Sequence, residues 1–210
     1  MTTAIIGTGA IGSAIARQLA AGGEDLQLSS ADKESARTLA TKIGGAAVVA
    51  TDNRSALSGA NAVILALRFS VLKDVIDDVA KALSDKLVVL PSNPVGLDAK
   101  GDVVRLLPEE KSSGEVVAEW LPAGARLAMA FGTMSADLFE SSSNRSPELA
   151  VLFYATDDRG ADEVERLIRT AGFEPVMVGG IKESSRLEVG GDLHDLVVGS
   201  AEARSLIGSG

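Results

Sequence analysis

The stretch TTAIIGTGAIGSAIARQLAAGG, residues 2–23, contains three closely spaced glycines between a short apolar segment and an Ala- and Ile-rich segment. Residues 2–7 predict a strand, and the residues from Ala10 predict a helix that ends at the glycine pair 22–23. In this setting Gly7 permits a tight turn, Gly9 lets a pyrophosphate approach the backbone, and Gly12 lets the helix pack closely on the strand. The run GTGAIG therefore predicts a dinucleotide at the helix N-terminus, with a ligand-free glycine turn as the alternative.

Strands and helices alternate along the rest of the chain. Strands are predicted over 26–30, 46–50, 61–67, 86–94, 125–132, 149–156 and 174–180. Helices are predicted over 32–45, 53–60, 70–83, 113–122 and 161–172, with a last helical segment from Ile181. The Ser-rich stretch 137–147 predicts an exposed loop. This order predicts an α/β fold with a Rossmann-type, doubly wound parallel sheet over 1–141 and a smaller C-terminal α/β unit over 142–210.

Composition excludes several classes of partner and site. The chain has 210 residues and a formal net charge of -9, which disfavours binding to nucleic acid or to an anionic membrane and favours a small-molecule partner. With no cysteine and a single histidine, His194, we predict no disulfide, no thiolate chemistry and no metal site. No apolar run reaches the roughly 18 residues of a membrane helix, and the first strand begins almost at once, so we expect a cytoplasmic protein.

The predicted cofactor is NADP rather than NAD. An acidic residue about 20 positions after the glycine turn usually binds the ribose of NAD, but this chain has Ser29 and Ser30 there. Their hydroxyls can donate to a 2′-phosphate, and Lys33 on the following helix adds positive charge, as does Arg37. For both cations a solvated helix face is the alternative. Thr8, inside the glycine turn, is a further hydroxyl within reach of phosphate.

The ends of three later strands are expected to complete the cofactor site, because ligands lie beyond the carboxyl ends of parallel strands. Leu67–Phe69 would follow the adenosine, Ser92–Pro94 would lie near the nicotinamide, and the backbone of Ala130–Met134 would bond its carboxamide. Alternatives remain: Phe69 belongs to the core, and SNP is a simple turn. The predicted cofactor-binding residues are Gly7, Thr8, Gly9, Ala10, Ile11, Gly12, Ser29, Ser30, Lys33, Leu67, Arg68, Phe69, Ser92, Asn93, Pro94, Ala130, Phe131, Gly132, Thr133 and Met134.

A proton donor is missing from these segments. Carbonyl reduction usually needs a positioned His, Tyr or Lys. The only histidine and the only tyrosine, His194 and Tyr154, both fall in the C-terminal unit. Hydride transfer between two cofactors needs mainly juxtaposition and exclusion of water. The pattern therefore favours a reaction of that type, and no catalytic residue is assigned.

Five segments together resemble the deazaflavin-dependent NADP reductase family: GTGAIGSAIARQLA, SNP at 92–94, AFGTM at 130–134, FYATDDRGADEVERLIRTAGFEPVMVGG, and RLEVGGDLH. The resemblance implies a homodimer with NADP on the N-terminal domain. It also implies a deazaflavin stacked on the nicotinamide, in a cleft that the C-terminal unit completes. The family also includes uncharacterised dinucleotide-binding proteins and the reductase domains of membrane ferric reductases. Two departures stand out, because members often have Asn at the position of Gly132 and Arg at that of Ser30.

By the same resemblance, LEVGGDLHDL lines the second substrate, which assigns Leu193 and His194 to it, with Met134 nearby. His194 has a core or dimer role as its alternative, because no sequence partner positions it. The expected function is hydride transfer between NADP(H) and a deazaflavin coenzyme. The alternatives are an NADPH-dependent reductase of a small imine, carbonyl, flavin or ferric substrate, and a dinucleotide-binding sensor without turnover.

Overall fold

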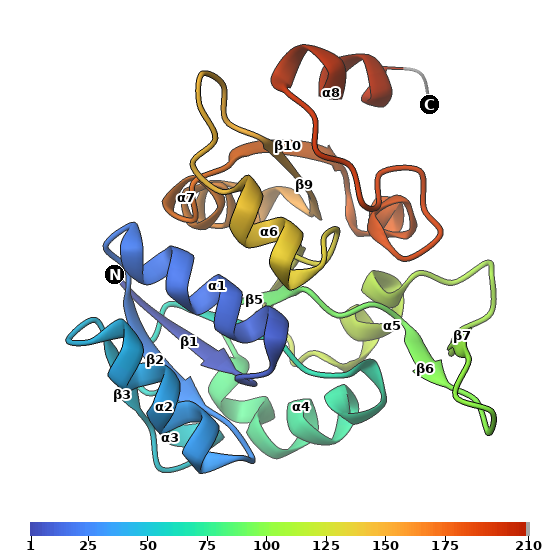
Figure 1. Ribbon diagram of the computed structural model, residues 1–210. Helices are drawn as coiled ribbons and strands as arrows, with labels where there is room; N and C mark the ends of the chain where they lie inside the picture. The colour runs from blue at the N-terminus through green and yellow to red at the C-terminus, as the bar shows by residue number, and fades with distance from the viewer. Residues whose placement is uncertain (209–210) are drawn as a thin grey trace.

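The computed structural model describes residues 1–208, which form one eight-stranded sheet with the strand order β10-β9-β8-β5-β4-β1-β2-β3 and a separate two-stranded hairpin, β6–β7 (Figure 1). The sheet strands are β1 (Thr2–Ile6), β2 (Asp25–Ser29), β3 (Ala47–Val49), β4 (Ala62–Leu65), β5 (Leu87–Leu90), β8 (Arg126–Met129), β9 (Val151–Thr156) and β10 (Glu174–Gly179). The hairpin strands are β6 (Val95–Leu97) and β7 (Val103–Arg105).

Helices cover both faces of the sheet. They are α1 (Ala10–Ala21), α2 (Lys33–Ile43), α3 (Asn53–Leu57), α4 (Phe69–Leu83), α5 (Ser113–Trp120), α6 (Ala136–Ser142), α7 (Ala161–Thr170) and α8 (Ser200–Ile207), with the 3-10 helices η1 (Asp158–Gly160) and η2 (Ile181–Leu187). Alternate residues of each strand enter different core clusters: in β4, Val63 and Leu65 pack toward α4, while Ile64 packs toward α1. The predicted Rossmann-type, doubly wound sheet is confirmed.

The two C-terminal strands continue the same sheet. Strands β1 to β5 and β8 pair in parallel, whereas β9 runs antiparallel to β8 with Ala128 opposite Thr156. Strand β10 is again parallel to β9. The boundary predicted near Ser142 coincides with the last residue of α6. The division of the chain into two units at that point stays a prediction.

The loop predicted over 137–147 is wrong in its first half, where α6 forms. Ser135 caps this helix by accepting a hydrogen bond from the amide of Leu138 at 3.3 Å. Phe139 is buried and stacks on Phe173 with ring centroids 4.8 Å apart. Serine is common in loops, but here one serine starts a helix, and a single aromatic side chain fixes that helix to the core.

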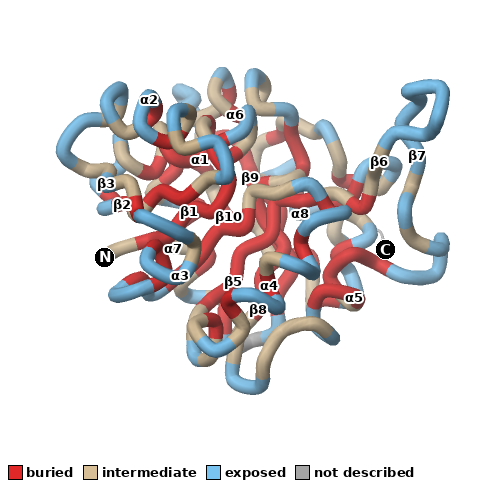
Figure 2. The backbone as a smooth tube through the Cα atoms, turned by 90° about the horizontal axis from the view of Figure 1, so that it is seen from below, coloured by how far each residue is buried: buried red, intermediate tan, exposed pale blue. Residues whose placement is uncertain are grey.

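Two further segments differ from the predictions. The hairpin β6–β7 lies in a part of the chain for which no element was predicted. The strand predicted over 86–94 is too long, because β5 ends at Leu90. The helical segment predicted from Ile181 ends at Leu187, and the next helix begins only at Ser200. In Figure 2 the central strands are buried and the hairpin projects from the body with an exposed surface. Within residues 1–208, no helix combines the length and the apolar character needed to cross a bilayer.

Candidate functional site

The glycine turn between β1 and α1 uses its three glycines for different reasons. Gly7 has a φ of +103°, and a Cβ on it would overlap the carbonyl oxygen of Ala66. A Cβ on Gly12 would overlap the carbonyl oxygen of Gly7. Gly9 has an ordinary φ of -69°, and no protein atom lies within 4 Å of the place where its Cβ would be. The fold therefore requires Gly7 and Gly12, whereas a side chain on Gly9 would fill only open space outside the chain.

The N-terminus of α1 is open at this turn. Gly9 is its N-cap residue, no side chain caps it, and its first turn contains no acidic residue. Helices α2 and α5 differ, because Asp32 and Ser112 cap them with side-chain oxygens. Uncapped amides and the positive end of the helix dipole favour an anion at such a terminus.

A cleft of about 330 Å³ lies against this terminus. Three segments that follow the ends of β1, β4 and β5 line it, and it thus brings together residues predicted from three separate motifs. Arg68 is the only charged residue of this lining, and its guanidinium has no hydrogen-bond or ion-pair partner among residues 1–208. In a chain of net charge -9, this cleft carries positive charge only. The lining residues are Gly9, Ala10, Ile11, Gly12, Ala66, Leu67, Arg68, Phe69, Pro91, Ser92, Asn93 and Val95.

The predicted ribose end contains hydroxyls that already have partners. Ser29 is buried, and its Oγ donates to Oδ1 of Asn53 at 2.8 Å. The Oγ1 of buried Thr8 lies 2.9 Å from the Oγ of Ser35. Both hydroxyls are thus bonded to side chains of neighbouring helices, Asn53 on α3 and Ser35 on α2, which sequence spacing does not reveal.

Ser30 and Lys33 are the remaining predicted groups at this end, and both are half-buried. Lys33 lies in the field of the Asp52 carboxylate. The pKa of Asp52 is lowered mainly by the backbone hydrogen bond from Ser55, so this carboxylate is ionised at neutral pH. A 2′-phosphate near Ser30 would therefore be attracted by Lys33, while the nearby Asp52 carboxylate would offset part of that positive charge.

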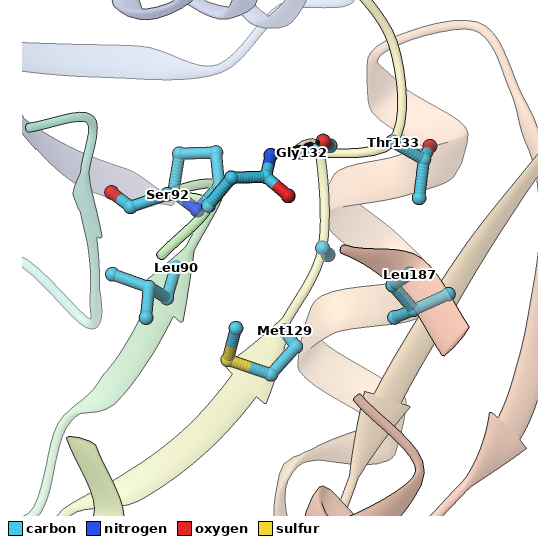
Figure 3. A pocket seen from close by; sticks show the side chains of 9 residues that line it. Leu90, Ser92, Met129, Gly132, Thr133 and Leu187 are labelled. Carbon is cyan, nitrogen blue, oxygen red and sulfur yellow. Dashed lines mark hydrogen bonds between the residues drawn. The ribbon is translucent and has the colours of Figure 1, made fainter. Parts of the chain in front are cut away.

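At the predicted nicotinamide end, a small cavity of about 10 Å³ separates the ends of β5 and β8 from η2. Figure 3 shows Leu90 and Met129 on the two strands, Gly132 and Thr133 on the loop beyond them, and Leu187 on the far side. A cavity of this size accommodates at most one water molecule, so a nicotinamide ring would have to lie in the larger cleft.

The loop 130–134 is constrained by its neighbours. A Cβ on Gly132 would overlap the carbonyl oxygen of Pro91, which explains the glycine at this position. Ala130, Phe131 and Met134 are buried in the core, so these three residues can offer only backbone groups for the predicted carboxamide contact. The buried Oγ1 of Thr133 has no hydrogen-bond partner in the described chain, which leaves one unpaired polar group beside the small cavity.

The two residues predicted for the second substrate do not form an exposed surface. Leu193 is fully buried in the core and exposes no side-chain surface to an acceptor in this structure, so its assignment to the second substrate stays a prediction. His194 is half-buried, with its Nδ1 3.1 Å from the carbonyl oxygen of Leu187 and its Nε2 3.7 Å from Asp195. Neither residue lines the cleft or the small cavity.

Tyr154 also lines neither the cleft nor the small cavity. It is fully buried and donates to Glu165 at 2.6 Å, and burial raises the pKa of its hydroxyl above the usual range. No histidine, tyrosine or carboxylate lines the cleft or the small cavity among residues 1–208. The sequence motifs of the cofactor site likewise contain no histidine or tyrosine.

The segment 187–195 is held in place by contacts that the sequence did not predict. Glu188, 3% exposed, accepts hydrogen bonds from the amide of Ser113 at 2.5 Å and its Oγ at 2.7 Å, and pairs with Arg105 at 2.9 Å. At the other end of the segment, the amide of Asp195 donates to the carbonyl oxygen of Thr133 at 2.7 Å. These partners lie on α5, on β7 and on the loop after β8, so no local sequence motif predicts the contacts.

Six lining residues were missed by sequence reasoning: Ala66, Leu90, Pro91, Val95, Met129 and Leu187. Ala66, Pro91 and Val95 directly adjoin predicted segments, and a wider window around each strand end would have included them. Leu187 lines the small cavity from a distant part of the chain, and only the tertiary structure places it there.

Comparison with known proteins connects this geometry to a family. The family model described as NADP oxidoreductase, coenzyme F420-dependent, matches residues 2–94. A hypothetical protein from Sinorhizobium meliloti is 27% identical with a TM-score of 0.83, and the alignment covers 95% of this chain and 96% of that one.

More distant structures share the fold. A proposed F420-dependent NADP-reductase from Arthrobacter sp. FB24 has a TM-score of 0.75 at 20% identity, with 88% of this chain and 89% of that one covered. An imine reductase from Bacillus cereus has a TM-score of 0.66 at 21% identity, but the match covers 88% of this chain and only 56% of that one. The resemblance inferred from the motifs is thus confirmed, and over residues 2–94 the chain matches the coenzyme F420-dependent NADP oxidoreductases.

Proposed function

We propose that this protein is an NADP-dependent oxidoreductase that transfers a hydride between NADP(H) and a deazaflavin coenzyme. The observation that carries the cofactor is Gly9, whose missing side chain is required neither by its φ nor by any neighbouring protein atom. It lies at the uncapped N-terminus of α1, on a cleft whose only charge is positive. A pyrophosphate is the ligand that fits an open glycine, a helix N-terminus and an arginine together.

When bound, NADP(H) supplies or accepts the hydride. The glycine turn would bind its pyrophosphate, Ser30 and Lys33 its 2′-phosphate, and the backbone of the loop 130–134 its carboxamide. The tight contact of that loop with Pro91 would keep water from the reacting face. In this assignment the chain orients the cofactor and excludes solvent, and no side chain has to move a proton.

A deazaflavin is favoured over an imine because of two observations. The cleft and the small cavity contain no acid or base among the described residues, and an imine or carbonyl substrate needs a proton along with the hydride. In addition, this sequence spans 89% of the proposed F420-dependent reductase but only 56–58% of the imine reductases and reductive aminases that share its fold. We also propose a homodimer, on the resemblance alone.

Direct transfer can be tested with NADPH that carries deuterium at both C4 positions, so that the label is transferred from either face. Purified protein would be mixed without oxygen with the labelled NADPH and oxidised coenzyme F420, and both absorbances would be followed. We expect equal loss of the two absorbances and deuterium in the reduced deazaflavin. Consumption of NADPH with a cyclic imine or a ferric chelate, but not with the deazaflavin, would contradict the proposal.

Arg68→Gln is expected to weaken the binding of NADPH and NADH about equally, by roughly tenfold, because a charged hydrogen bond to phosphate contributes about 1.5–3 kcal/mol. Fluorescence titration of both dinucleotides would measure the loss. The matched control is Lys81→Gln, an exposed cation in the last turn of the same helix. If only NADPH is weakened, Arg68 contacts the 2′-phosphate instead.

Ser30→Asp is expected to shift the preference from NADPH toward NADH by about tenfold or more, since a carboxylate repels the 2′-phosphate and accepts from a free 2′-hydroxyl. Ser30 is preferred to Ser29 for this test because the Ser29 hydroxyl is bonded to Asn53. Ser58→Asp, at the exposed end of α3, controls for added charge. An unchanged ratio of affinities would remove Ser30 from the ribose site.

A further inference from the structure

One side chain joins three distant parts of the chain at the nicotinamide end of the cleft. The Nδ2 of Asn93 donates to the carbonyl oxygen of Gly132 at 2.9 Å. Its Oδ1 accepts a hydrogen bond from the backbone amide of Val189 at 2.8 Å. A single carboxamide thus links the chain after β5, the loop after β8 and the segment 187–195.

Asn93 lies where the two spaces of the site meet. It lines the 330 Å³ cleft and also the 10 Å³ cavity that Leu187 closes. Pro91 and Ser92 share this position, but the Oγ of Ser92 donates back to the carbonyl oxygen of Leu67 at 2.5 Å. Among the residues that line both spaces, Asn93 is therefore the one whose side chain forms a hydrogen bond with the segment 187–195, at the amide of Val189.

Packing does not explain the position of Val189. Its side chain is 44% exposed, whereas its neighbour Glu188 is buried and bonded away from the cleft, to Ser113 and Arg105. The next hydrogen bond from this segment to the cofactor loops is that of the Asp195 amide to the carbonyl oxygen of Thr133, six residues later. Between Glu188 and Asp195 the segment is also held internally, by the bond from the Gly191 amide to the Glu188 carbonyl oxygen at 2.7 Å and by the buried Leu193. The hydrogen bond to Asn93 is the one that ties this part of the segment to the chain after β5.

We infer that Asn93 is a positioning residue that sets the distance between the segment 187–195 and the nicotinamide end of the cofactor cleft. This inference rests on the proposed hydride transfer. Leu187 brings this segment to the small cavity at that end, so a shift of the segment would change the space in which an acceptor has to meet the nicotinamide. Reacting atoms must approach to about 3–3.5 Å, and a displacement of about 1 Å costs roughly 100-fold in rate. Loosening this link should therefore slow hydride transfer far more than it weakens dinucleotide binding.

Two variants separate the bonds of Asn93. Asn93→Ala removes both hydrogen bonds, whereas Asn93→Asp keeps an oxygen for the Val189 amide and loses the donor to Gly132. Asn61→Ala is the control, an exposed asparagine at the opposite end of the sheet, just before β4. For each protein we would measure the thermal midpoint, the NADPH dissociation constant, and the single-turnover rate with oxidised coenzyme F420.

The expected result is a single-turnover rate roughly 100-fold lower for Asn93→Ala, a smaller loss for Asn93→Asp, and for both a much smaller rise in the NADPH dissociation constant. An unchanged rate would overturn the inference. A dissociation constant that rises in step with the loss of rate would also overturn it, because Asn93 would then bind the cofactor directly.

Amide hydrogen exchange tests the link without turnover. In Asn93→Ala the Val189 amide should exchange faster, while the Asp195 amide, bonded to Thr133, should not change. In Asn93→Asp the Val189 amide should stay protected. If the parent protein reduces no deazaflavin, the proposed function fails, whereas unchanged exchange at Val189 in Asn93→Ala would overturn the positioning role by itself.

Discussion

Replacement of Gly9 by valine should abolish dinucleotide binding while the protein stays folded. The Cβ of the new side chain would contact nothing beyond its chain neighbours, since no other heavy atom lies within 4 Å of its position, but the side chain would occupy the space that a pyrophosphate needs. Thermal unfolding with and without NADPH measures the effect. Ligand at about 100 times its dissociation constant stabilises the parent by about 2.7 kcal/mol, and the variant should show no shift.

Gly45→Val is the matched control for this experiment. Gly45 also has no atom within 4 Å of its Cβ position and lies on the exposed connection between α2 and β3, outside the lining of the cleft. This variant should keep the full NADPH-induced shift. A shift that persists in Gly9→Val would mean that the phosphates bind elsewhere, and the cofactor site proposed for the α1 N-terminus would be wrong.

Glu188→Ala should lower the free energy of unfolding by about 3 kcal/mol, because it breaks a buried ion pair and leaves its partners without an acceptor. The lost bonds are those to the amide and hydroxyl of Ser113 and to the guanidinium of Arg105, which is itself 28% exposed. Urea unfolding would show a lower midpoint with an unchanged slope.

Two further variants serve as controls for the loss of stability in Glu188→Ala. Glu119→Ala breaks an exposed pair with Lys111 at 3.9 Å and should cost less than about 1 kcal/mol. Glu188→Gln keeps the size and one acceptor oxygen, so its loss should be intermediate. If Glu188→Ala costs no more than Glu119→Ala, solvent reaches this site and the carboxylate does not fasten the segment 187–195 to α5 and the hairpin.

Much of the fold could be predicted because its signals are local. The strand 2–6, the glycine turn and helix α1 follow one another in a pattern that neighbouring residues decide, and the buried strand β4 is apolar at every position. The hairpin β6–β7 and helix α6 could not be predicted in the same way. Each is short, and each depends on a bond or a buried ring supplied by another part of the chain, such as Arg105 to Glu188 or Phe139 on Phe173.

The sequence by itself determined the doubly wound sheet, the glycine turn and the absence of an obvious proton donor, because periodicity, turn chemistry and residue content do not depend on distant contacts. The tertiary structure decided which predicted groups remain open to a ligand. The Ser29 hydroxyl is already bonded to Asn53, and Leu193 is buried in the core. Gly9 and Arg68, in contrast, line the cleft. The link from Asn93 to Val189 spans 96 positions, and only chain folding brings such groups within bonding distance.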